Sequence, residues 1–152
     1  NGGQFTSGVP EYCMIEGCIE YVPGEKSKDV IKSFEDTVQA ACAGDEWMLA
    51  HRPTVEWFGL LYEPASTDVE HPLIQTAVES FEEMLHEKPA INGFEAGTDM
   101  RLLSNNFGVP GFMFGAGDIG MAHAPNEYVD IDELVKSAKV MALLIAKWCG
   151  IC

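Results

Sequence analysis

The sequence has few basic residues: 9 lysines and arginines stand against 24 aspartates and glutamates, for a formal net charge of -15. Nucleic-acid binding depends on basic side chains that neutralise phosphates, so this composition argues against a nucleic-acid partner. An anionic membrane surface is disfavoured for the same electrostatic reason. The excess of acid indicates a solvated, soluble surface, because net charge bears on solubility more than on fold.

The sequence also lacks a long apolar run. No stretch approaches the roughly 20 apolar residues that span a bilayer, and no signal peptide is recognisable. The first residue is Asn1 instead of methionine, and residues 1–4 have the composition of a loop. We therefore expect a cytoplasmic protein whose upstream part is missing from this chain.

A disulfide framework is missing as well, because the 5 cysteines are an odd number without the spacing of a secreted scaffold. We interpret them as buried, reduced thiols of a cytosolic protein. Cys149 and Cys152 have the spacing of a redox dithiol. Such a pair needs its first thiol at a helix N-terminus, whereas this one follows a helix, so a thiol-redox function is the weakest alternative.

Hydrophobic residues make up 47% of the chain, which is enough to bury a core. Residues 11–22 alternate between apolar and polar side chains and predict a half-buried strand. A helix is expected from the candidate N-cap Ser27 to just before Gly44, because apolar residues recur there at helical spacing. Residues 54–62 predict a second strand. Together these elements indicate a small α+β layer, followed by a linker at residues 63–68.

The second half of the chain alternates between helices and strands. Helices are expected from Pro72, over residues 100–106 and after the capping residue Asp130. Short strands are expected up to about Gly93 and over residues 109–114. This order predicts an α/β fold with a parallel sheet and flanking helices. The last helix has an apolar stripe that we expect to face the core, formed by Ile131, Leu134, Val135, Ala138, Met141, Ala142 and Ile145.

In parallel sheets, ligands bind at the carboxyl ends of the strands. Two glycine-rich loops leave such ends, at residues 93–101 and 115–123. The second loop contains His123, and imidazole is the commonest metal ligand near neutral pH. A metal site needs three or four ligands, and no second histidine or cysteine stands at ligand spacing from it. By itself, His123 is therefore either a metal ligand or an ordinary surface histidine.

Arg101 is one of few cations in the chain and ends the first loop. Its planar guanidinium matches a carboxylate through two hydrogen bonds, so it is a candidate for holding an anionic substrate group. Thr98 and the amide of Gly97 are weaker donors for the same group. The alternative is a structural salt bridge from Arg101 to Asp99 or Glu95, and the residue types alone leave both interpretations open.

Several segments stand in the order and spacing of a known signature. In the last third they are residues 97–101 (GTDMR), 108–110 (GVP), 114–118 (FGAGD) and 122–129 (AHAPNEYV). Upstream they are Val9-Pro10, Gly17, residues 21–25 (YVPGE), and Asp68 with residues 71–73 (HPL). This combination resembles the C-terminal part of the M20 metallopeptidase and amidohydrolase family, in particular its acetylornithine deacetylase and succinyl-diaminopimelate desuccinylase group. The resemblance covers essentially the whole chain.

The resemblance implies an enzyme of amino-acid biosynthesis that uses two zinc ions, or cobalt, to cleave the amide bond of N-acyl amino acids or short peptides. It implies that residues 1–66 belong to a lid domain that forms a homodimer, and residues 67–152 to the catalytic domain. His123 would then be the terminal histidine ligand of one zinc ion. The resemblance places Gly97, Thr98 and Arg101 along the loop for the substrate carboxylate, and Glu127 and Asp99 as neighbours that steady the site.

The resemblance also shows what is absent from this chain. The family's His-x-Asp ligand pair, its Glu-Glu pair with the general base, its later acidic ligand and its lid histidine have no counterpart here, because they come earlier in the family's chains. Glu20 stands where several relatives carry an arginine. We therefore expect this segment to be inactive by itself. Two alternatives are a non-catalytic dimerisation module and a family member that has lost its ligands.

Overall fold

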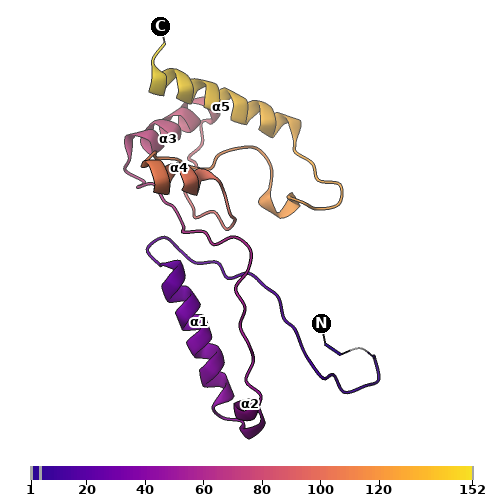
Figure 1. The fold of residues 1–152 in the computed structure, drawn as a ribbon. Helices are drawn as coiled ribbons and strands as arrows, with labels where there is room; N and C mark the ends of the chain where they lie inside the picture. The colour runs from indigo at the N-terminus through magenta and orange to yellow at the C-terminus, as the bar shows by residue number, and fades with distance from the viewer. Residues whose placement is uncertain (1, 4, 152) are drawn as a thin grey trace. The chain divides into compact units, whose positions relative to one another are not determined.

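The computed structural model describes residues 2–3 and 5–151 and divides into two units, Asn1–Val55 and Glu56–Cys152 (Figure 1). All the regular structure in the described part of the chain is helical, and the only β-pairing there consists of isolated bridges. The predicted domain boundary after residue 66 concerns the domains of a complete enzyme and stays a prediction.

Two helices form in the first unit, α1 (Ser27–Cys42) and α2 (Glu46–Ala50). The N-cap of α1 is Lys26, so Ser27 is already inside the helix and the predicted cap was one residue too late. Helix α2 was not predicted from the sequence. The signal for it is Asp45, whose carboxylate accepts a hydrogen bond from Met48 N at 2.8 Å, as N-cap aspartates commonly do.

The second unit contains α3 (Pro72–Leu85), α4 (Met100–Phe107), a short 3-10 helix η1 (Ile119–Met121) and α5 (Ile131–Cys149). The three predicted α-helices are therefore present, close to the expected bounds. Proline at the first position of α3 suits a helix start, because its missing N–H would have no intrahelical partner there. The Asp130 carboxylate caps α5 by accepting from the backbone N–H groups of Asp132 and Glu133.

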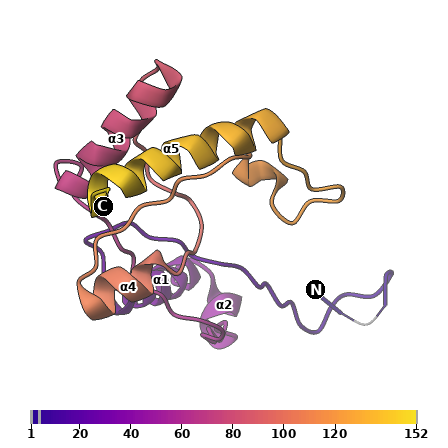
Figure 2. The same ribbon diagram turned by 90° about the horizontal axis from the view of Figure 1, so that it is seen from above.

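Helices α3 and α5 lie side by side and form the centre of this unit (Figures 1 and 2). Ser80 on α3 is fully buried, and Val140 on α5 is 2% exposed. An ion pair of 2.8 Å between Lys147 Nζ and Glu83 Oε2 joins the same two helices at the surface. A small hydroxyl side chain such as Ser80 allows close helix approach, since its own Oγ donates to Thr76 O within α3.

The apolar stripe predicted for α5 is not the face that packs on α3. Ile131 is 75% exposed and Ile145 is 54% exposed, whereas Val140 and Leu144 are buried. The prediction was wrong because α5 has apolar residues on more than one face. Periodicity shows that a helix is amphipathic, but it does not show which of two adjacent apolar faces a given neighbour covers.

The predicted parallel sheet is not confirmed. The segments expected to be strands, at residues 11–22, 54–62, 89–93 and 109–114, contain no strand in the described part of the chain, although Figure 1 shows much of them as elongated trace. A strand requires hydrogen bonds to a neighbouring strand. Their β-forming composition marks side chains that fit a pleated, half-buried surface, but it does not supply the partner.

One extended segment, residues 62–67, is attached to α4 and to the run that follows it. The Thr67 hydroxyl donates to Gly111 O at 2.6 Å and accepts from Gly111 N at 3.0 Å. The Asn105 side chain on α4 donates to the backbone oxygens of Glu63 and Pro64, at 3.1 and 3.3 Å. These contacts hold the segment beside α4, the helix that carries the candidate residue Arg101.

Three of the described cysteines, Cys13, Cys18 and Cys149, are exposed, and Cys42 is buried. The expectation of buried thiols was therefore wrong for three of these four residues. Cys152, the second member of the considered redox pair, lies outside the described residues. In the same described part of the chain, none of the helices is long and apolar enough to cross a membrane.

Candidate functional site

The first candidate loop ends at α4, and its basic side chain lies on an aromatic ring. Asp99 is the N-cap of α4, and Arg101 is the second residue of the helix. The Arg101 guanidinium carbon lies 3.4 Å from the centroid of the Tyr62 ring. This is a close cation–π contact, in which the planar guanidinium and the ring attract one another electrostatically.

Gly97 lies at the same ring. A Cβ atom at this position would lie 3.7 Å from Tyr62 Cε2 and 3.8 Å from Cδ2, which is ordinary van der Waals distance. Tyr62 thus has two of the predicted substrate-binding residues, Gly97 and Arg101, as neighbours. Thr98, the third, lies half-buried directly after Gly97.

The salt bridge considered for Arg101 is not formed in the described part of the chain. Neither Asp99 nor Glu95 makes an ion pair with it. Its Nε atom is buried and has no hydrogen-bond partner. A buried donor without an acceptor is costly, which makes this side chain unusual among the polar groups of the unit. Arg101 thus contacts the Tyr62 ring and pairs with neither Asp99 nor Glu95.

The second candidate loop holds His123 in an unusual backbone conformation. His123 has φ 61°, in the left-handed region that non-glycine residues rarely adopt. Its backbone N–H donates to Glu127 Oε2 at 3.2 Å, and Glu127 N in turn donates to Ala124 O at 3.2 Å. Glu127, expected to steady His123, therefore contacts its backbone, and His123 is exposed. Whether this contact serves a metal site stays a prediction.

The same loop is joined to α5. The Glu133 carboxylate in the first turn of α5 accepts from Gly117 N at 3.2 Å. At the start of η1, Asp118 accepts from Gly120 N at 2.8 Å. The glycine-rich stretch is therefore a tight turn held by acidic side chains, which bind backbone N–H groups well.

The residues described here do not assemble a metal site by themselves. No group of three histidine, cysteine, aspartate or glutamate side chains within them is arranged to hold a metal ion. His123 is a single imidazole, whereas a zinc site takes three or four protein ligands. Any metal bound through His123 would need its other ligands from residues beyond these.

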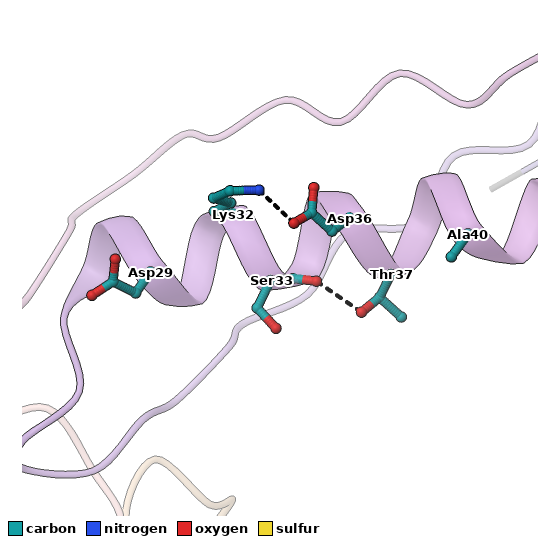
Figure 3. A pocket seen from close by; sticks show the side chains of 6 residues that line it. All are labelled: Asp29, Lys32, Ser33, Asp36, Thr37 and Ala40. Carbon is teal, nitrogen blue, oxygen red and sulfur yellow. Dashed lines mark hydrogen bonds and ion pairs between the residues drawn. The ribbon is translucent and has the colours of Figure 1, made fainter.

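A shallow hollow lies along α1 in the first unit. Asp29, Lys32, Ser33, Asp36, Thr37 and Ala40 line it (Figure 3). The Asp36 carboxylate lies 2.6 Å from Lys32 Nζ and raises the pKa of that amine through a hydrogen bond and its charge. The lining is an exposed polar helix face with local pairs, so it offers no candidate active site.

Tyr62 has no role that was predicted from the sequence. It lies at the end of a segment expected to be a strand and directly before the expected linker. Its neighbours Gly97 and Arg101 are distant in the sequence, and no local pattern predicts such a contact. The one sequence feature that could have drawn attention to Tyr62 is its position as an aromatic residue directly before the expected linker.

A comparison with known families decides the assignment. The profile of the family described as Peptidase family M20/M25/M40 matches residues 5–147. The chain belongs to this family. The match confirms the resemblance seen in the sequence motifs, and it includes both candidate loops.

Known members of the M20 family resemble the chain over most of its length. It is 27% identical over 157 aligned residues to an N-formyl-4-amino-5-aminomethyl-2-methylpyrimidine deformylase of Bacillus subtilis, a match that covers 98% of this chain and 37% of that protein. The deformylase of the same name from Halalkalibacterium halodurans is 24% identical, over 97% of this chain and 36% of that protein.

A third relative is a Pyrococcus horikoshii protein named provisionally as a LysW-lysine/LysW-ornithine hydrolase. It is 29% identical over 64% of this chain and 30% of its own length. The chain thus spans little more than a third of the length of the curated M20 relatives it matches. No solved structure matches it significantly. By their names, all three relatives are hydrolases.

Proposed function

We propose that the complete protein is an M20-type amidohydrolase that cleaves the amide bond of a small N-acyl compound bearing a carboxylate, such as an N-acyl amino acid. Family membership supports hydrolysis, because the relatives are named as hydrolases. The observation that supports an anionic substrate is Arg101, a cation that pairs with neither Asp99 nor Glu95, the two acids considered for it, in the described residues.

In this proposal, Arg101 binds the substrate carboxylate. Its guanidinium carbon lies over the Tyr62 ring, and a guanidinium donates its hydrogen bonds in its own plane, so the ring contact and a bidentate carboxylate are compatible. The Gly97 N–H and the Thr98 hydroxyl are additional donors on the same loop. Asp99, at the start of α4, keeps the predicted supporting role.

We further propose that the hydrolysis depends on metal, zinc or cobalt, with His123 as one ligand and Glu127 holding its backbone. When bound, such metal ions lower the pKa of water and polarise a carbonyl. The general base and the other ligands would come from outside the described residues. The homodimer through residues 1–66 and the cytoplasmic location are proposals that rest on the family resemblance.

A second candidate substrate is an N-formyl aminopyrimidine. It is favoured because the two relatives that match nearly the whole chain are both deformylases of such a compound. The compound in their name carries no carboxylate. The two candidates therefore differ in what they require of Arg101.

The test uses the full-length, metal-loaded enzyme. We would compare kcat/KM for an N-acyl amino acid, its carboxamide and the N-formyl aminopyrimidine, for the native enzyme and for Arg101→Lys. Charge-assisted hydrogen bonds are worth roughly 1.5–3 kcal/mol, so we expect Arg101→Lys to lower kcat/KM for the carboxylate by about tenfold to a hundredfold. The value of kcat/KM for the carboxamide should change much less.

The matched control is Arg52→Lys, since Arg52 bonds Gln39 in the other unit and takes no part in the candidate site. It should leave all three values unchanged. If Arg101→Lys lowered kcat/KM equally for the N-acyl amino acid and for its carboxamide, the role of Arg101 in carboxylate binding would be overturned. The second candidate would be favoured if the native enzyme had its highest kcat/KM for the N-formyl aminopyrimidine and Arg101→Lys did not change that value.

A further inference from the structure

The Arg101 side chain is partly buried, yet few polar contacts hold it in place. Its buried Nε has no hydrogen-bond partner, and neither Asp99 nor Glu95 pairs with it. An arginine side chain has many rotamers, and holding one of them costs conformational entropy. The contact that opposes this freedom is the Tyr62 ring, 3.4 Å from the guanidinium carbon.

The Tyr62 ring is itself well placed to act as a support. The residues that follow it are tied to α4 by Asn105, which donates to the backbone oxygens of Glu63 and Pro64. A few residues later, Thr67 is bonded twice to Gly111. Since Arg101 is on α4, the ring and the guanidinium are attached to the same helix.

Gly97 leaves the space that the ring needs on its edge. A methyl group at position 97 would just touch Tyr62 Cε2 and Cδ2, and a larger side chain would press on them. The loop that approaches the ring also carries the two proposed donors, the Gly97 N–H and the Thr98 hydroxyl. Tyr62 therefore connects the parts of one binding surface that are separated in the sequence.

We infer that Tyr62 is a positioning residue: it fixes the plane of the Arg101 guanidinium so that its in-plane N–H groups are available to a planar carboxylate. This inference rests on the proposed function of Arg101 and extends it to a residue without a substrate contact of its own. Tyr62 thereby contributes to the preference for acids over the corresponding amides.

The experiment measures a ratio in the full-length, metal-loaded enzyme: kcat/KM for an N-acyl amino acid divided by kcat/KM for its carboxamide. Tyr62→Phe keeps the ring and should keep the ratio. Tyr62→Leu removes the ring and should lower the ratio by roughly threefold to thirtyfold, the range expected of a cation–π contact. The loss should appear mainly in KM for the acid. Tyr12→Leu, the same change at an exposed tyrosine in the other unit, should leave the ratio unchanged.

A second series answers the possibility that Tyr62→Leu does not fold. Starting from Tyr62→Phe, phenylalanines with one, two and three ring fluorines keep the shape of the ring and progressively weaken its negative face. We expect the ratio to fall stepwise along this series. A ratio that stays constant across the fluorinated variants would overturn the inference.

The outcomes separate this inference from the proposed function. If Arg101→Lys lowers the ratio and the Tyr62 series does not, Arg101 binds the carboxylate without help from Tyr62, and only the present inference fails. If Arg101→Lys leaves the ratio unchanged, the proposed carboxylate site fails, and the present inference fails with it.

Discussion

At the scale of single residues, the backbone at His123 is the most informative feature. A side chain at φ 61° costs roughly 1 kcal/mol or more, because Cβ crowds the carbonyl oxygen. Strain of this kind persists where the surroundings impose it, and it gathers at functional sites. Here a Glu127 carboxylate holds the His123 N–H. The strained position and the proposed metal ligand coincide.

This strain leads to a prediction about stability. His123→Gly should unfold at a higher urea concentration than His123→Ala, by about 1 kcal/mol in the free energy of unfolding, because glycine adopts positive φ without strain. Both variants should lose metal affinity in the full-length enzyme, since both remove the imidazole.

The control is the neighbouring Ala124, whose φ is not positive. Ala124→Gly should destabilise the protein, by roughly 0.5–1 kcal/mol, because glycine loses more backbone freedom on folding. If glycine were no better than alanine at position 123, the left-handed conformation would not be a property of the folded protein.

At the scale of elements, the contact between Thr67 and Gly111 fastens an extended segment to the rest of its unit. The hydroxyl serves as both donor and acceptor, which replaces part of the pairing that a strand neighbour would provide. Such a contact matters in a unit whose regular structure is helical in the described residues. It also keeps Tyr62, five residues earlier, close to α4.

Thr67→Val has nearly the same shape and removes both hydrogen bonds. We expect a loss of about 1–3 kcal/mol in the free energy of unfolding, since the part-buried N–H and C=O of Gly111 lose their partner. Thr67→Ser should retain most of the stability.

Thermal or urea unfolding measures the effect, with Thr37→Val as the matched control. The Thr37 hydroxyl donates to Ser33 O on an exposed helix face, so Thr37→Val should change the free energy of unfolding by no more than about 0.5 kcal/mol. Equal effects at positions 67 and 37 would mean that the Gly111 contact does not stabilise the unit.

At the scale of the whole molecule, the chain matches only part of its relatives' length. It spans 37% of the Bacillus subtilis relative, and its described residues contain no group that could hold a metal ion. The extended segments expose large apolar side chains, such as Ile15 and Leu60. Such exposure often marks surfaces that other protein elements cover.

We therefore predict that the purified 152-residue chain shows no zinc-dependent deacylation and retains no stoichiometric zinc after gel filtration. The full-length protein should retain about two zinc ions, the number that the M20 family implies, and should lose activity when they are chelated. The zinc content and the intact mass would be measured on the same samples of both proteins. Zinc-dependent hydrolysis by the 152-residue chain would contradict this prediction.

Much of this protein follows from local rules that act along the sequence. The starts of α3 and α5 were predictable, because Pro72 and Asp130 are chemically suited to helix starts. The family was predictable too, because its motifs depend on residue types at short spacings within two loops. His123, Gly97 and Arg101 could be nominated from those motifs, although their roles remain proposals.

Only the tertiary structure decided how these local pieces meet. It selected Val140 and Leu144 as the face of α5 that packs on α3, where periodicity favoured other residues. In the described residues it formed isolated bridges in place of the expected strands, since a strand exists only through its neighbours. It brought Tyr62 onto Arg101, a contact between distant residues with no trace in local pattern. Helix starts and motifs depend on nearby residues, whereas packing faces, strand pairing and the support of a binding residue depend on which segments come together in space.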